Sequence, residues 1–163
     1  ALSSLAILSG DPWLASTRET RALPTTTASA TLATCAAVAA RNIRIIRDEG
    51  IVEHVRQTAA PHLARRWAEL ADHPLGGEAR CKGLVGALEL VADKAARTRF
   101  PEIGKTGTLC RDFCFDNGII MRAVRDTMII SPPLVITPAQ IDELVALARR
   151  SLDLTANRLG VST

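Results

Sequence analysis

One arginine, Arg122, lies inside an otherwise apolar, strand-like segment, Ile119–Val124. Arginine is seldom buried without a partner, so a charge in this position needs an explanation. Its planar guanidinium group binds a carboxylate through two parallel, charge-assisted hydrogen bonds. The residue types therefore allow two interpretations. Arg122 forms a structural ion pair, with Asp126 or Glu89 as the partner, or it binds a carboxylate that comes from solution.

The cysteines are the other residues that could do chemistry. Cys35 and Cys81 stand far from each other and from the remaining two, and the spacing matches no disulfide framework. Cys110 and Cys114 are one helical turn apart and could contact a metal, but no third or fourth ligand is evident beside them. We therefore favour a structural role for Cys110 and Cys114 over a metal site.

Composition and charge limit the classes of function. The chain has 163 residues, of which 47% are hydrophobic and 23% charged, as in an ordinary globular domain. Its net charge of +3 and its 3% aromatic content are too low for a nucleic-acid surface. No apolar run reaches the roughly 20 residues of a membrane helix, and the first residues do not resemble a signal peptide. The expected location is the cytoplasm.

Arg122 must be positioned by the strands around it. The segments Ile119–Val124 and Thr127–Ile130 flank the polar pair Arg125-Asp126, which predicts a hairpin that ends before Pro132-Pro133. A further strand is predicted in the segment Gly83–Val91. Its two glycines, Gly83 and Gly86, indicate close backbone approach.

Helical periodicity accounts for much of the rest. A helix over Ala37–Asp48 should end at Gly50, and Pro61 should kink or restart the next helix. Thr137 has the features of an N-cap, with proline at the first helical position and glutamine as capping-box partner. Together the pattern predicts an α+β fold with helices packed on a short sheet. The four helices are expected over Ala37–Asp48, Val52–Leu70, Thr106–Phe115 and from Pro138 to beyond Leu152.

Several separated sequence motifs resemble those of one known family, and they occur in the same order along the chain as in that family. They are Ile46–Gly50, Gly83–Leu90, Asn117–Ala123 and Ser131–Leu134. Over Asn42 to about Ala156 the chain resembles the C-terminal part of class III pyridoxal-phosphate-dependent aminotransferases, in the omega-transaminase branch. Cys81-Lys82 departs from the family pattern, which often has a glycine first.

The resemblance implies a fold, a cofactor and a role for one residue. The fold is the C-terminal small domain of a fold-type-I transferase, and the cofactor of the intact enzyme is pyridoxal 5'-phosphate. In the family, the arginine of the Met-Arg-Ala phrase binds the carboxylate of an amino-acid or keto-acid substrate and can swing aside for an amine that lacks one. Arg122 occupies that place. The intact enzyme is expected to be a homodimer.

The resemblance also divides the chain. Residues 35–163 correspond to the small domain and residues 1–34 to a remnant of the large domain. Lys82, the first lysine of this chain, does not match the family's catalytic lysine. That lysine, the aspartate for the ring nitrogen and the main phosphate-binding loop are therefore expected upstream of Ala1.

The stretch Thr27–Thr34 stands where the family carries His-Gly-Phe-Thr-Tyr-Ser-Gly-His-Pro. Codons for threonine, alanine, serine and leucine, shifted by one base, permit most of that motif in order. Residues 21–34 are therefore expected to be a frameshifted form of it, with a diverged linker as the alternative. The family's threonine for the cofactor phosphate lies in this motif, so no cofactor-binding residue is assigned to this chain.

Two hypotheses of function follow. In the first, the chain is part of a transaminase that moves an amino group from an amine or amino acid to a keto acid, and Arg122 binds the substrate carboxylate. In the second, the polypeptide itself is a catalytically inactive, truncated product, or a dimerisation and packing module. The second is favoured for the isolated chain and the first for its family. The Met-Arg-Ala phrase makes an aminomutase or a decarboxylase a weaker third choice.

Overall fold

The computed structural model describes residues 25–161 of the chain. The chain divides into two compact units, Ala1–Ile45 and Ile46–Thr163. Most of the expected large-domain remnant, residues 1–34, lies outside the described residues, as do the first four residues of the expected frameshifted stretch. The division of the chain at residue 35 stays a prediction.

Helix α1 spans Thr25–Asp48 and is longer than the helix expected over Ala37–Asp48. Alanine is frequent in its first half. Because alanine has the highest helix propensity, it favours a helix there even without apolar residues at a helical period. Beyond its end, Gly50 adopts the left-handed conformation, with φ of 61°, and its N–H donates to the carbonyl of Arg47 at 3.1 Å. The expected stop at Gly50 is confirmed.

The second predicted helix is interrupted, as Pro61 suggested. Helix α2 covers Ile51–His54, a π-helical turn covers Val55–Ala59, and helix α3 restarts at Ala60 and ends at Ala68. Proline has no N–H, and its ring crowds the carbonyl four residues earlier, so the wider turn directly before it accommodates both effects. A 3₁₀ turn, Glu69–Asp72, leads from α3 to the sheet.

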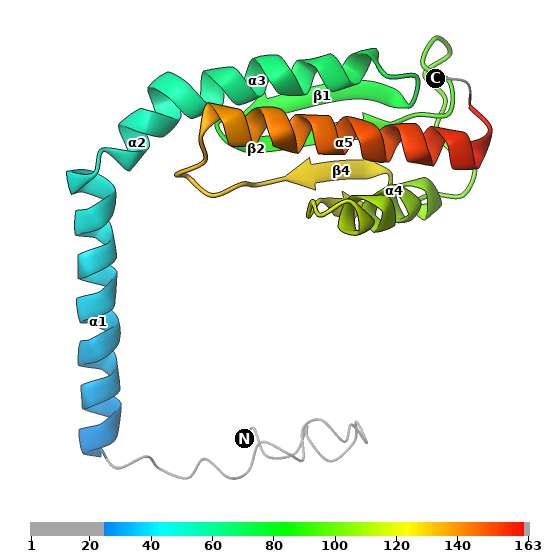
Figure 1. Cartoon of the computed structure of the whole chain (residues 1–163). Coiled ribbons are helices and arrows are strands. Elements are labelled where there is room, and N and C mark those ends of the chain that lie inside the picture. The colour runs from blue at the N-terminus through cyan, green and yellow to red at the C-terminus, as the bar shows by residue number, and fades with distance from the viewer. Residues whose placement is uncertain (1–24, 162–163) are drawn as a thin grey trace, which may run out of the picture. The chain divides into compact units, whose positions relative to one another are not determined.

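Four antiparallel strands form the sheet in the order β1-β2-β4-β3 (Figure 1). The predicted strand within Gly83–Val91 and the predicted Arg122 hairpin are confirmed, although the first strand of the hairpin is shorter than expected. β1 is an additional strand. Its alternating residues are charged, so no apolar pattern marks it in the sequence. The strands are β1 (Gly76–Lys82), β2 (Val85–Leu90), β3 (Arg122–Val124) and β4 (Thr127–Ile130).

The two glycines expected to allow close backbone approach serve different purposes. Gly86 does allow it, because a Cβ there would lie 2.9 Å from Cγ1 of Ile130 and 2.9 Å from Cε2 of Trp67. Gly83 has open space around it and instead turns the chain between β1 and β2, with φ of 59°. The prediction was right for Gly86 and wrong for Gly83, where the left-handed turn is the constraint.

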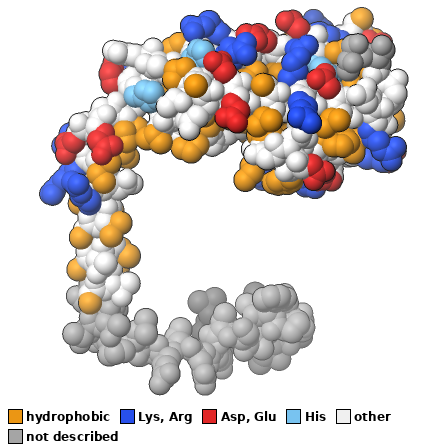
Figure 2. Space-filling view, viewed as in Figure 1, with side chains coloured by type: hydrophobic (Ala, Val, Ile, Leu, Met, Phe, Trp, Pro, Cys, Tyr) orange, Lys and Arg blue, Asp and Glu red, His pale blue; other side chains and the backbone are white. Residues whose placement is uncertain are grey.

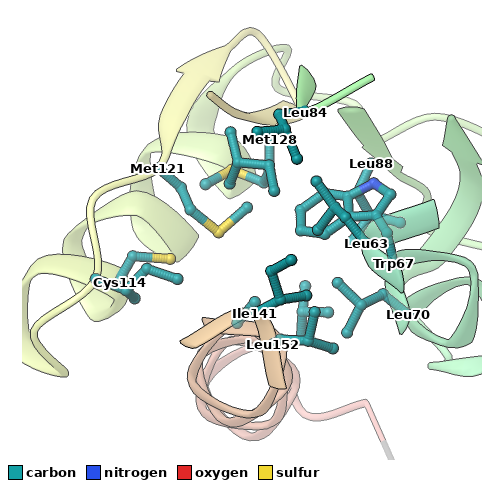
Figure 3. Packing of buried hydrophobic residues seen from close by; sticks show 14 of the residues in the cluster. Leu63, Trp67, Leu70, Leu84, Leu88, Cys114, Met121, Met128, Ile141 and Leu152 are labelled. Atoms are coloured by element: carbon teal, nitrogen blue, oxygen red, sulfur yellow. The ribbon is translucent and has the colours of Figure 1, made fainter. Parts of the chain in front are cut away.

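Three helices cover one face of the sheet: α3, α4 (Lys105–Asp116) and α5 (Pro138–Leu159) (Figure 1). The core lies between them and the sheet (Figure 3). There Trp67 of α3 is fully buried, and Ile141 of α5 faces the residues of the sheet. The expected α+β fold with helices packed on a short sheet is confirmed. The largest fully buried apolar side chains are Trp67, Leu63, Leu70, Leu75, Leu88, Leu90, Met128, Ile141 and Leu152.

The outer surface of α3 and α5 carries charges of both signs (Figure 2). Asp142 of α5 accepts hydrogen bonds from Nε2 of His62 and from Nε of Arg66, each at 2.8 Å. These bonds hold the pKa of Asp142 below its ordinary value.

At the start of α5, Thr137 and Gln140 form the expected capping box. Among the described residues, no helix is long and apolar enough to cross a membrane.

Cys110 and Cys114 lie on α4 as free thiols, and both are buried in the core. A hydrogen bond to Cys114 and burial raise the pKa of the Cys110 thiol. Because both side chains are buried among the core residues, they pack as small apolar groups. Within residues 25–161, no group of three or more histidine, cysteine, aspartate or glutamate residues is arranged to hold a metal.

His73 is a buried histidine in the turn before β1. Its Nδ1 accepts a hydrogen bond from the N–H of Leu75 at 3.1 Å, so the proton of the neutral ring is on Nε2. Nε2 lies 3.2 Å from Oδ1 of Asp153, but without the geometry of a hydrogen bond. Burial lowers the pKa of His73; the nearby carboxylate of Asp153 opposes this, and the positive charges of Arg149 and Lys94 add to the lowering.

This pKa makes stability depend on pH in a defined direction. In the unfolded chain, His73 takes up a proton near pH 6.5, whereas the folded chain resists protonation until the pH is lower. The contribution is present above about pH 6.5 and is lost as the pH falls through the folded-state pKa, by at most about 1.4 kcal/mol per pH unit. Urea unfolding of the parent chain and of His73→Gln between about pH 7.5 and 5.5 measures it. An identical pH dependence in both would contradict the assignment.

Candidate functional site

The face of the sheet away from the helices presents Arg122. Burial alternates along β2 and β4, and the residues between the buried ones point to the opposite side. Pairing in register places Arg80 opposite Ala87, Ala87 opposite Ile129, and Ile129 opposite Arg122, so these four share one side. We call this side the open face. It comprises the row Arg80, Ala87, Ile129 and Arg122 and the adjacent row Glu89, Thr127 and Val124.

Arg122 is exposed on the open face and has no ion pair or hydrogen bond with its side chain among the described residues. Both carboxylates that could be its structural partners are engaged elsewhere. Oε1 of Glu89 lies 3.6 Å from Nη2 of Arg99. The carboxylate of Asp126 accepts hydrogen bonds from the backbone of α4 and the residue before it. In this structure the guanidinium of Arg122 is therefore available to a ligand.

Two anchors hold the short strand that carries Arg122. On one side is Met121, which is only 3% exposed and belongs to the core. On the other side is the turn between β3 and β4. There Oδ2 of Asp126 accepts from the N–H of Gly104 at 2.8 Å, and Oδ1 accepts from the N–H of Gly107 at 2.9 Å. The Asp126 carbonyl also accepts from the N–H of Leu90 at 2.8 Å.

The turn and the start of α4 approach so closely that a side chain does not fit. A Cβ at Gly107 would collide with the carbonyl oxygen of Arg125. Arg125 itself has φ of 56°, in the left-handed region that favours glycine. The importance of Asp126 and Gly107 does not follow from helical or strand periodicity. The glycines at 104 and 107, just where a helix begins, are the one signal in the sequence that points to this junction.

Other charged residues near the site have ordinary surroundings. Arg80 forms an ion pair with Glu78 on the same strand, at 3.2 Å. Hollows of about 420, 500 and 150 Å³ lie beside the sheet, and Arg122 lines none of them. The largest of the three is apolar for the most part and lies against Pro132, Pro133 and Leu144. The hollow of 420 Å³ holds three cationic and two anionic side chains and so has no strong preference for one charge.

Comparisons with known proteins identify the class. The chain is 64% identical over 121 residues to a putrescine–pyruvate aminotransferase of Pseudomonas aeruginosa, a match that covers 74% of this chain and 26% of the relative. It is 35% identical over 127 residues to a diaminobutyrate–2-oxoglutarate transaminase of Halomonas elongata, covering 77% and 27%. It is 32% identical over 123 residues to a gamma-aminobutyrate transaminase of Solanum lycopersicum, covering 76% and 24%. No family model matches the chain.

Solved structures agree with these relatives. A transaminase with L-alanine superposes with a TM-score of 0.72 at 36% identity, covering 76% of this chain and 29% of that one. The omega transaminase of Pseudomonas jessenii in complex with PMP superposes with a TM-score of 0.69 at 32% identity, covering 75% and 27%. The helices and antiparallel sheet thus form part of an aminotransferase fold.

The chain belongs to the class III pyridoxal-phosphate-dependent aminotransferases, and it spans about a quarter of the length of the curated relatives that it matches. The described residues do not by themselves fit the cofactor, which needs a lysine for covalent attachment in a closed site. Lys82, Lys94 and Lys105 are all exposed. Lys94 donates to the carbonyl of Ala71, and Lys105 pairs with Glu102 at 2.9 Å.

The strained turn residue gives a test of this junction. Replacing Arg125 by glycine should stabilise the chain by about 1 kcal/mol, because a left-handed conformation costs roughly 1–2 kcal/mol for other residues and glycine's greater freedom in the unfolded chain offsets part of that gain. Urea unfolding followed by circular dichroism measures the change.

A matched control is Arg111→Gly, in the middle of α4, where glycine should instead destabilise the helix by about 1 kcal/mol. Equal effects of the two substitutions would show that the conformation of Arg125 is not strained.

Proposed function

We propose that this segment supplies the carboxylate-binding residue of a transaminase, which moves an amino group from an amine or amino acid to a keto acid such as pyruvate. The observation that carries the proposal is Arg122 itself. Its guanidinium is exposed and unpaired among the described residues, yet its strand is anchored through Met121 and Asp126. It also stands in the Met-Arg-Ala phrase of the family.

The side chain of Arg122 would act by binding and orientation. Its planar fork matches a substrate carboxylate with two parallel hydrogen bonds, and it holds the rest of the acid in a fixed direction. For an amine without a carboxylate, the same long side chain can turn aside into solvent, since no group among the described residues holds it in place. Pyridoxal phosphate, when bound, supplies the electron sink for the chemistry.

The remaining parts of the enzyme are proposed to lie outside residues 25–161. They include the lysine, the aspartate for the ring nitrogen and the phosphate site, and a second subunit in a cytoplasmic homodimer. The similarity to a putrescine–pyruvate aminotransferase supports a diamine as amino donor and pyruvate as acceptor. The exposed positions of all three lysines support the second hypothesis for the isolated chain, namely a packing module without catalysis of its own.

Adding pyridoxal phosphate to the purified chain separates these two functions. We expect the chain to show no more absorbance from lysine-bound cofactor than a mixture of pyridoxal phosphate and free lysine shows. We also expect no transfer of an amino group from putrescine to pyruvate, because no described lysine lies in an enclosed site. The full-length Pseudomonas aeruginosa relative serves as the positive control. Turnover by the isolated chain would overturn the view that it lacks catalysis.

The role of Arg122 is tested in a chimera, in which the matched segment of this chain replaces the corresponding segment of the Pseudomonas aeruginosa relative. Arg122→Ala should raise KM for pyruvate by roughly 10- to 100-fold, since a lost hydrogen bond to a charged group costs about 1.5–3 kcal/mol. The amine half-reaction with putrescine should change less than about twofold, since putrescine has no carboxylate.

The control is Arg80→Ala, in the same row of the open face, because Arg80 is already paired with Glu78. It should leave both substrates unaffected. Equal losses for pyruvate and putrescine in Arg122→Ala would argue that Arg122 is structural.

A further inference from the structure

Asp126 joins three parts of the second unit at one point. Its carboxylate accepts the N–H groups of Gly104 and Gly107, at 2.8 and 2.9 Å, and its carbonyl accepts the N–H of Leu90. One residue in the hairpin turn therefore binds the start of α4 and the end of β2 together. A carboxylate in this position also interacts favourably with the positive end of the helix dipole of α4.

The strand that carries Arg122 depends on this junction more than other strands would. β3 has three residues and lies at the edge of the sheet, where β4 is its one pairing partner among the described residues. The buried side chain of Met121 fixes its first end. Its second end leads directly into the turn, where Arg125 has an unfavourable left-handed φ. The hydrogen bonds of Asp126 offset that strain and hold this end.

The same hydrogen bonds also keep the carboxylate of Asp126 from pairing with Arg122 in place of a substrate carboxylate. Asp126 is the carboxylate closest in sequence to Arg122 on the hairpin, four residues away, and a free carboxylate there would attract the guanidinium. Because two backbone N–H groups occupy both of its oxygens, Asp126 is not paired with Arg122. Burial of the junction against Gly107, which has no room for a Cβ, keeps this arrangement closed.

We propose that Asp126 is a positioning residue for substrate-carboxylate binding, which fixes the strand of Arg122 against α4 and keeps the guanidinium free for the substrate. This inference rests on the proposed function of Arg122. It assigns to Asp126 no contact with the substrate. Its effect should therefore appear only with substrates that carry a carboxylate, and only while Arg122 is present.

The experiment uses the chimera with the Pseudomonas aeruginosa relative and compares two amino acceptors, pyruvate and an aliphatic aldehyde of similar size that lacks the carboxylate. Asp126→Ala should raise KM for pyruvate about tenfold with little change in kcat, because a misplaced binding group weakens orientation. The aldehyde should change less than about twofold. Asp126→Asn, which keeps one acceptor oxygen, should fall between the parent and Asp126→Ala.

Three further variants make the outcome decisive. Adding Asp126→Ala to Arg122→Ala should leave the pyruvate-to-aldehyde ratio at the value of Arg122→Ala alone. Asp112→Ala, an exposed carboxylate on α4 that pairs with Arg111, should change neither acceptor. Gly107→Ala disturbs the same junction from the other side and should shift the ratio in the same direction as Asp126→Ala.

Equal losses for both acceptors in Asp126→Ala, or an unchanged ratio, would overturn the role of Asp126 while leaving that of Arg122 intact. If Arg122→Ala itself did not change the pyruvate-to-aldehyde ratio, the proposed role of Arg122 in carboxylate binding would be wrong, independently of Asp126. Should Asp126→Ala not fold, as judged by circular dichroism, the ratio measured with Asp126→Asn decides by the same criteria.

Discussion

The close approach of the β3–β4 turn to the start of α4 determines where the hairpin lies. It requires glycine at position 107, where a Cβ would collide with the carbonyl of Arg125, and it places two N–H groups of the α4 start against the carboxylate of Asp126. These groups have no partners within the helix and would otherwise need water or another cap. The junction thus satisfies the helix end and fixes the hairpin with the same two hydrogen bonds.

That constraint matters because the sheet is covered on one side only within the second unit. Helices α3, α4 and α5 bury the residues of one face around Trp67, and antiparallel sheets of this kind commonly leave the other face open. The open face cannot draw rigidity from packing within that unit. Its positions are set by strand pairing and by the turns, and the β3–β4 turn that Asp126 fixes lies next to Arg122.

Local signals in the sequence were sufficient for the α5 cap, the stop at Gly50, the break at Pro61 and the hairpin, because each depends on residues close to one another in the chain. They were insufficient for β1, whose alternating charged residues form a strand through pairing with β2. The capping of α4 by Asp126 joins residues 19 and 22 positions apart, and no periodicity reports such a contact. The role proposed for Arg122 rests on its Met-Arg-Ala setting.

The two interpretations of Arg122 differ in whether a nearby carboxylate of the chain is free to pair with it. A structural ion pair requires Asp126 or Glu89 to be free, and the structure engages the first with backbone N–H groups and the second with Arg99. An exposed guanidinium without a partner loses little, because water solvates it. In a site closed by the rest of an enzyme that water would be excluded, and the charge would then need a carboxylate. Since Asp126 and Glu89 are both engaged, the carboxylate of a substrate is the partner that such a closed site would supply.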